Sequence, residues 1–409
     1  MSTMIISDTS VESQPRAATA TRRLESIDLL RGIVMIIMAL DHVRDYFHAN
    51  AFIADPTDLS HTSPLLFLTR WITHLCAPVF VFLAGTSAYL YGVRRSRAEL
   101  AFFLCTRGLW LVFAELFIVT FEWTFNPTYQ VFNLQVIWAT GVSMICLSAL
   151  IYTNRLTVLL LGIAIIAGHN LLDGIHVPGK GAASFLWALL HETGKFSFGS
   201  LAFSVRYPLL PWIGIICVGY GFGGVYAAGH GARQRQEGLM LCGLAAMLLF
   251  FILRIDNFYG DAAHWSRQGS AVFDVLSFLN VTKYPPSLLY TLVTIGPALV
   301  FLSLAERPLN RLTSMLTVLG RVPMFYYLLH LFLIHLLAIL GAVVCGYHWS
   351  DMILSTRVNA APQLKGYGFD LGVVYLVWIC VVVALYPLCK WFDGYKRHNQ
   401  ATKWWLSYL

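Results

Sequence analysis

The feature that most constrains this chain is a series of apolar stretches, each long enough to cross a membrane. A hydrocarbon core of ~30 Å needs about 20 mainly apolar residues of helix. Such stretches occupy residues 26–48, 65–92, 99–122, 132–152, 156–173, 207–227, 237–255, 286–305, 314–342 and 370–389. With 57% hydrophobic and 12% charged residues, the composition lies outside the range of soluble globular proteins. We therefore expect an all-α, polytopic integral membrane protein with about ten transmembrane helices.

The positions of the basic residues predict how these helices are oriented. With the N-terminus inside the cell, every cytoplasmic connection is short and basic, as the positive-inside rule requires. The cytoplasmic residues are then Arg94, Arg95, Arg97, Arg155, Arg233, Arg235, Arg307, Arg311, Lys390, Lys396, Arg397 and Lys403. We expect a disordered cytoplasmic tail at 1–25, a membrane domain at 26–395 and a cytoplasmic C-terminal tail at 396–409.

Charge and cysteine usage exclude several other classes of protein. The net charge of +7 follows from the basic cytoplasmic connections, so no nucleic-acid partner is expected. The eight cysteines show no CxxC pairing and lie mostly in apolar segments, so we expect neither a disulfide framework nor a bound metal.

The expected outer connections differ from the cytoplasmic ones in length. They are 174–206, 256–285 and 343–369, and within the first of them 183–194 resembles an amphipathic helix at the outer interface.

The first predicted helix carries an unusual number of charges. At helical spacing one face of it holds Asp28, Arg31, Met35, Met38, His42 and Asp45. The eleven residues from Arg31 to His42 span ~16 Å, which places Arg31 near the cytoplasmic entrance and His42 near the outer end. Ionisable groups within a membrane span usually face a protein interior or a water-filled cavity.

This stripe of side chains has a catalytic and a structural interpretation. Histidine suits proton transfer near neutral pH, and Asp45 or Asp41 would orient the His42 ring. In the structural interpretation Asp28 and Arg31 form an ion pair at the start of the helix, and His42 is a hydrogen-bonded core residue. Spacing alone leaves both interpretations open.

Several motifs add a family resemblance. The segment "RLESIDLLRGIVMIIMALDHVRDYF" resembles the opening of bacterial DUF1624 proteins, which are related to heparan-α-glucosaminide N-acetyltransferase and, more distantly, to the acyltransferase-3 family. The latter carry Asp-x-x-Arg, ten residues and an essential His, a spacing that Asp28, Arg31 and His42 match. Further similar segments are "HLCAPVFVFLAGTSAYL", "RGLWLVFAEL", "LQVIWATG", "GHNLLDGI", "KYPPSLLYTLVTIGPAL" and "RVPMFYYLLHLFLIH".

This resemblance implies an acyltransferase that works across the bacterial inner membrane. It would take an acyl group, most simply acetyl, from cytosolic acyl-CoA and deliver it to an extracytoplasmic sugar or glycoconjugate. Arg31, Arg107 and Arg321 would bind the donor, because guanidinium groups suit phosphate geometry, and Asp28 would belong to the same donor site. His42 would act as general base or as nucleophile. A homodimer is also compatible with this interpretation.

One departure from the family pattern leaves a second candidate for the catalytic histidine. The related lysosomal enzyme has Asn where this chain has His42, and its active histidine lies in the following luminal segment. In this chain His48 or His61 would occupy that second arrangement. His42 is preferred on the acyltransferase-3 spacing, and His61 is retained as its rival.

Other polar residues in or near the membrane are candidates for binding the acceptor. They are Arg70, His74, Gln135, His169, Asn170, Lys283 and His330. For each, the alternative is a structural role in pairing helices, capping them or starting them. Two further functions stay open: a proton-coupled transporter that uses the same polar residues, and a non-catalytic sensor or scaffold. The apparent lack of internal repeats disfavours the transporter.

Overall fold

The computed structural model describes residues 25–226, 231–306, 308–356 and 361–409, and these segments are predominantly helical. The first half contains α1 (Glu25–Phe47), α2 (Pro64–Trp71), α3 (Cys76–Gly92), α4 (Arg97–Phe113), α5 (Thr120–Thr124), α6 (Val136–Leu150), α7 (Arg155–Gly168) and α8 (Ala182–Leu190). The second half contains α9 (Leu209–Gly223), α10 (Ala232–Asp256), α11 (Ala271–Leu279), α12 (Leu288–Leu304), α13 (Arg311–Arg321), α14 (Pro323–Val344) and α15 (Leu371–Asn399). The expected tail at 1–25 lies almost wholly outside the described residues.

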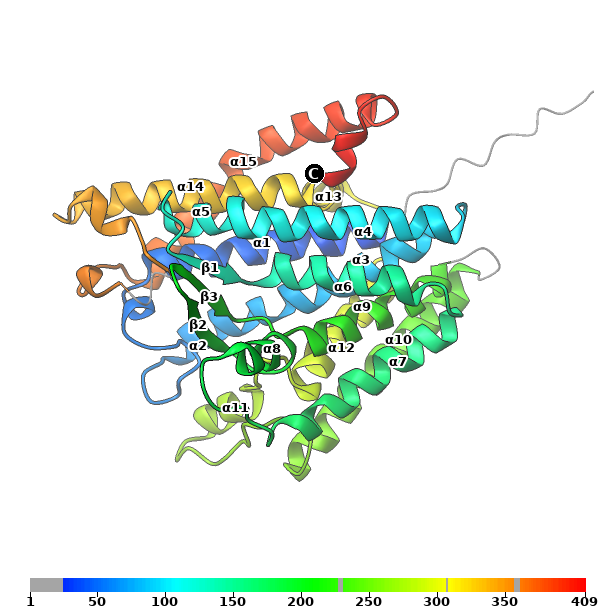
Figure 1. The fold of residues 1–409 in the computed structure, drawn as a ribbon, viewed down its shortest axis with the longest axis horizontal. Coiled ribbons are helices and arrows are strands. Elements are labelled where there is room, and N and C mark those ends of the chain that lie inside the picture. The colour runs from blue at the N-terminus through cyan, green and yellow to red at the C-terminus, as the bar shows by residue number, and fades with distance from the viewer. Residues whose placement is uncertain (1–24, 227–230, 307, 357–360) are drawn as a thin grey trace, which may run out of the picture.

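Within the described residues, seven helical segments are long and apolar enough to span a membrane. They are 64–92, 97–124, 155–172, 209–226, 232–256, 323–344 and 371–399, and α6 and α12 are shorter apolar helices. The helix α1 carries more charge than an ordinary span, but it lies among these helices (Figure 1). The chain is therefore an integral membrane protein, while the number ten and the location of the termini stay predictions.

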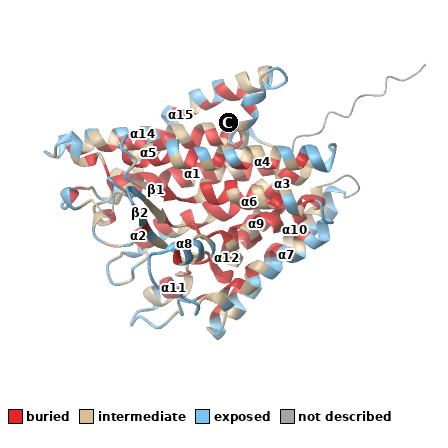
Figure 2. Ribbon diagram, viewed as in Figure 1, coloured by how far each residue is buried: buried red, intermediate tan, exposed pale blue. Residues whose placement is uncertain are grey.

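The charged helix α1 lies at the centre of the bundle. It contacts α3, α13, α14 and α15, and most of its length is buried, whereas α7, α10 and α15 expose their outer faces (Figure 2). Exposed leucines on α10, such as Leu241 and Leu248, suit a face toward lipid. The packing places the polar stripe of α1 inside the protein, as its amphipathic spacing predicts.

Two glycines allow α1 and α13 to pack backbone against backbone. A Cβ atom at Gly32 would lie 2.0 Å from the Leu316 carbonyl oxygen, and one at Gly320 would lie 1.8 Å from the Asp28 carbonyl oxygen. Such close approach of small residues is a common basis of helix association in membranes. The contact holds the start of α1 against the end of α13, which carries Arg321.

The expected span at 65–92 is interrupted between α2 and α3 by a short 3-10 turn, Ile72–Leu75. Pro78, in the first turn of α3, has no N–H to donate to the carbonyl of His74 four residues earlier. The hydroxyl of Tyr290 donates to that carbonyl instead, at 2.9 Å. A neighbouring helix thus satisfies the freed backbone group, as a membrane interior requires.

The expected span at 314–342 is wrong as a single helix. Chain geometry breaks at Val322, whose φ of −128° and ψ of 49° are not helical, and α14 starts anew with Pro323. Proline is well suited to the first helical position because its missing N–H is not needed there. The break leaves Arg321 at the end of α13, at the edge of the cavity described below.

The all-α expectation is confirmed for most of the chain but misses a small sheet. Strands β1 (Val131–Leu134), β2 (Gly194–Phe198) and β3 (Leu201–Val205) form a sheet of order β1-β3-β2. β1 and β3 are parallel, with Val131 opposite Ala202, and β2 and β3 form an antiparallel hairpin. The sheet joins two connections that are distant in sequence, so no local pattern revealed it. The expected interfacial helix near 183–194 corresponds to α8.

Candidate functional site

A cavity of about 430 Å³ runs along α1. The α1 residues that line it extend from Arg31 to Asp45, a rise of ~21 Å, so it reaches from near one end of the helix to near the other. The charged residues and histidine on its wall are Arg31, Asp41, His42, Arg44, Asp45, Asp55, Arg70, Arg107, Arg206, Lys283, Arg321 and Lys396. Eight of these are basic and three are acidic, so the cavity favours an anionic ligand.

Three arginines line the part of the cavity near the start of α1, each on a different helix. Arg31 on α1 donates to Asp28 at 3.2 Å and to the Gly320 carbonyl at 3.1 Å. Arg321 on α13 forms a two-pronged ion pair with Asp393. Arg107 on α4 donates to the Ser407 carbonyl, and among the described residues no carboxylate forms an ion pair with it. Arg107 therefore retains the most charge for a ligand.

The C-terminal end of α1 is organised around Arg44 rather than around His42. One nitrogen of Arg44 donates to Asp41 and to Asp45, both at 2.7 Å. Arg70 approaches Asp41 at 3.9 Å. The two carboxylates line the cavity, but no described hydrogen bond joins either of them to His42. The expectation that Asp41 or Asp45 orients the His42 ring is therefore wrong for this structure.

Opposite these carboxylates, the segment before α12 adds two more polar residues. The guanidinium of Arg206 lies 4.3 Å from the centre of the Tyr284 ring, and the ammonium of Lys283 lies 5.3 Å from it. Burial opposes ionisation of the Tyr284 hydroxyl, but the nearby cations Arg206, Lys283 and Arg70 outweigh it and lower its pKa to about 7. This end of the cavity therefore carries a phenol that ionises near neutral pH.

His42 lies between the two ends, with 8% of its surface exposed. Its Nδ1 is 2.9 Å from Nε2 of His330 on α14, and the planes of the two rings are nearly parallel, at 2°. Nδ1 of His330 is in turn 2.8 Å from the Tyr326 carbonyl oxygen. Trp123 packs edge-on against His42 with ring centres 5.0 Å apart.

This chain of contacts fixes the tautomers of a neutral histidine pair. A carbonyl oxygen only accepts, so Nδ1 of His330 must carry the proton, and its Nε2 must then accept. His42 therefore donates from Nδ1, which leaves the lone pair on its Nε2. With Nδ1 occupied, Nε2 is the nitrogen of His42 that can meet a ligand in the cavity.

Several predicted residues lie elsewhere. Arg31, Arg70, Arg107, Gln135, Lys283 and Arg321 line the cavity with His42, whereas Asp28, His61, His74, His169, Asn170 and His330 do not. His61 is exposed and bonded to Asp58. His74 is buried behind the wall, and His330 supports His42 instead of touching the cavity. His169 and Asn170 belong to a separate cluster. Of the two candidate catalytic histidines, His42 lines the cavity and His61 does not, and the catalytic role of either stays a prediction.

Sequence reasoning missed several residues of the wall, among them Arg206, Trp123 and Tyr327. Arg206 lies in a connection that gave no motif, and Trp123 and Tyr327 look like ordinary apolar-belt residues in sequence. A basic residue two positions before Pro208, the residue that precedes α9, was the available signal for Arg206. No sequence pattern pointed to the two aromatic residues.

Comparisons with known proteins identify the family. The model for "Heparan-alpha-glucosaminide N-acetyltransferase, catalytic" matches residues 23–255, more than half of the chain. A comparison with curated proteins finds no match. The matched segment includes α1 with Arg31 and His42, together with Arg70, Arg107, Gln135 and Arg206. On this match, the chain belongs to the family of membrane acetyltransferases that carry the heparan-α-glucosaminide N-acetyltransferase catalytic domain.

Proposed function

We propose that this protein transfers an acyl group, most simply acetyl, from cytosolic acyl-CoA to an amine or hydroxyl of an extracytoplasmic sugar or glycoconjugate. The observation that carries the proposal is the cavity along α1, which has a cluster of arginines at one end and His42 toward the other. We place the protein in a bacterial inner membrane with the arginine end toward the cytoplasm, in keeping with the positive-inside rule.

The inner end of the cavity would bind the donor. Arg31, Arg107 and Arg321 present guanidinium groups that match phosphate oxygens in geometry and charge. Arg31 and Arg321 are held by Asp28 and Asp393, which fixes their orientation. Arg107 donates to a backbone carbonyl and has no carboxylate partner among the described residues, so of the three its charge is the least compensated. The narrow path along α1 would then take the pantetheine arm toward His42.

The reaction needs two proton transfers at His42, one from the acceptor to the imidazole and one from the imidazole to the leaving sulfur. Nε2 takes the proton of the acceptor N–H or O–H as its N or O attacks the thioester carbonyl carbon. When the tetrahedral intermediate collapses, the C–S bond breaks, and the CoA sulfur leaves with the electron pair and takes the proton from His42. The Tyr326 carbonyl and His330 stabilise the imidazolium formed in between, a role that a carboxylate plays in hydrolase triads.

The outer end of the cavity would hold the acceptor. Arg70, Arg206 and Lys283 provide cations there, and Tyr284 provides a hydroxyl that ionises near neutral pH. Hydrogen bonds from charged groups favour a polar or anionic acceptor. Gln135, at the start of α6, also lines the cavity and offers an amide to the donor carbonyl or the acceptor.

Acetyl transfer by the purified protein in proteoliposomes tests the proposal. We expect release of free CoA when acetyl-CoA is present with a glucosamine-containing acceptor, and loss of this release in His42→Ala. His61→Ala, on an exposed loop, serves as the matched histidine control and should keep full activity. Full activity of folded His42→Ala would contradict the assignment. Uptake of solute without any acyl donor would favour a transporter instead.

A further inference from the structure

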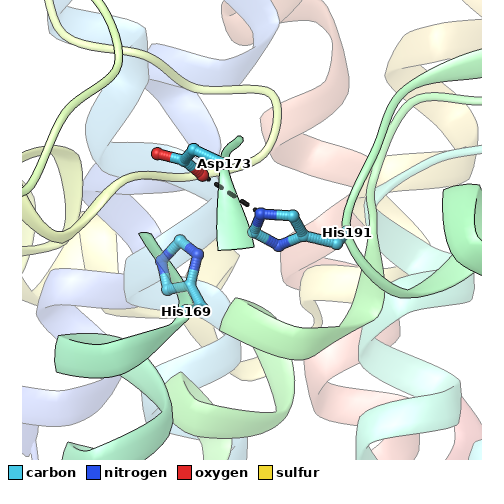
Figure 3. Close-up of side chains that lie close together, drawn as sticks. All are labelled: His169, Asp173 and His191. Carbon is cyan, nitrogen blue, oxygen red and sulfur yellow. Dashed lines mark hydrogen bonds and ion pairs between the residues drawn. The ribbon is translucent and has the colours of Figure 1, made fainter. Parts of the chain in front are cut away.

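A second cluster of ligating side chains lies apart from the cavity, beyond the end of α7. His169 begins the short 3-10 turn that follows α7, Asp173 comes directly after that turn, and His191 directly follows α8. One ligand atom from each residue lies within 4.8 Å of the other two. In Figure 3 the three side chains point toward a common centre, and Nε2 of His191 is 3.1 Å from Oδ1 of Asp173.

The two histidines of this cluster are buried without sufficient partners. His169 and His191 are only 3% and 2% exposed. Among the residues that the structure describes, neither ring nitrogen of His169 makes a hydrogen bond of normal geometry, although the Pro286 carbonyl lies near it, and Nδ1 of His191 finds no hydrogen-bond partner there either. Buried polar atoms are nearly always hydrogen-bonded, so such unpaired nitrogens need an explanation.

A metal ion accounts for this arrangement. We propose that His169, Asp173 and His191 form a three-ligand site for Zn²⁺. Two imidazoles and a carboxylate are a typical donor set for this ion, with ligand atoms at ~2.0–2.2 Å from it. Tetrahedral ligands at that distance are roughly 3.4 Å apart, so a modest movement of the His169 ring closes the site. Asp173 is partly exposed and leaves room for a water as fourth ligand.

The surroundings of the cluster supply the supporting contacts that metal ligands need. Nδ2 of Asn170 donates to Oδ2 of Asp173 at 2.8 Å, and Trp187 packs against the His191 ring. Such contacts orient ligands and are a regular part of metal sites. The same Asn170 accepts from the backbone N–H of Leu288 at 2.9 Å. The proposed site is thereby connected to the segment that carries Lys283 and Tyr284.

This connection assigns the ion a structural role at the outer end of the protein. It would join the end of α7 to the end of α8 and hold the start of α12, on which the position of Lys283 and Tyr284 depends. The inference rests on a cluster separate from His42, so it stands whether or not the proposed acyl transfer is correct. It also departs from the sequence-based expectation that no metal is bound.

Metal analysis of the intact, detergent-purified protein tests the site. We expect about one zinc per chain in the wild type after dialysis against metal-free buffer. His169→Gln and His191→Gln should each lower this content at least tenfold, because each removes one of three ligands. His264→Ala, which removes an exposed histidine of another outer connection, is the matched control and should keep the wild-type content.

Cobalt substitution gives a second measurement that does not depend on variant stability. Co²⁺ added to chelator-treated wild type should give the visible absorption bands of a tetrahedral site, and equimolar Zn²⁺ should abolish them. Zn²⁺ should also raise the Tm of the chelator-treated wild type, but not of His191→Gln. Failure of the wild type to retain zinc or to bind cobalt, or equal zinc content in wild type and His191→Gln, would overturn the proposal.

Discussion

The hydrogen bond between His42 and His330 allows the tautomer argument to be tested directly. Replacing His330 by Leu removes the acceptor for the Nδ1 proton of His42, 2.9 Å away. The His42 ring then either keeps a buried, unpaired N–H or moves its proton to Nε2. In the second state Nε2 has no lone pair, so it cannot take a proton from the acceptor.

The size of the effect follows from the cost of an unpaired buried group. Leaving a buried donor without its partner costs about 1–3 kcal/mol. Because 1.4 kcal/mol corresponds to a tenfold change in an equilibrium constant, the active tautomer, with its proton on Nδ1 of His42, becomes about 5- to 150-fold less populated relative to the tautomer with the proton on Nε2. We expect kcat to fall by about this factor. The KM for acetyl-CoA should change by less than about twofold, because His330 does not line the cavity.

The assay is release of CoA at saturating acetyl-CoA, compared across three variants in proteoliposomes. His330→Gln retains an oxygen that accepts a hydrogen bond and should recover part of the lost rate. Phe332→Leu, on an exposed position of the same helix, is the matched control for altered packing of α14. The reasoning is refuted if folded His330→Leu keeps kcat within about twofold of wild type, or if Gln and Leu lower it equally.

Three further predictions concern other parts of the protein. Arg107→Gln should weaken acetyl-CoA binding by about 10- to 150-fold in calorimetry, since a hydrogen bond to a charged group contributes about 1.5–3 kcal/mol; unchanged affinity would exclude a contact with the donor. Tyr284 should ionise near pH 7, seen as a tyrosinate absorbance step that Tyr284→Phe lacks and Arg206→Gln moves to higher pH. Folding lowers the pKa of Tyr284 from about 10. The contribution of Tyr284 ionisation to the free energy of unfolding is therefore complete above pH ~10 and is lost as the pH falls through about 7. Gly320→Leu should lower Tm strongly, since its Cβ would lie 1.8 Å from a backbone oxygen, whereas Gly394→Ala, with open space around it, should not.

Much of the fold follows from local patterns in the sequence. Apolar length predicts the membrane-spanning segments, and the interruption of the second span at Ile72–Leu75 lies just before Pro78, which lacks the backbone N–H that a continuous helix needs. The small sheet was missed because β1 pairs with β3, about 70 residues later, and only the folded chain brings them together. The division at Val322 was missed because the expected span was drawn straight through Arg321 and Pro323, although α13 is much more polar than α14.

Some features of the candidate site likewise follow from the sequence, and others depend on the tertiary structure. The sequence by itself determined that Arg31 and His42 share one face of α1 at a separation of ~16 Å, because helical periodicity is a local property of the chain. Only the tertiary structure decided which groups meet that face. His42 finds His330, 288 residues away, instead of its neighbours Asp41 and Asp45, because Arg44 binds both carboxylates and the packing of α14 on α1 brings a second imidazole to Nδ1. Partners of this kind depend on the packing of distant helices, which no spacing within one helix encodes.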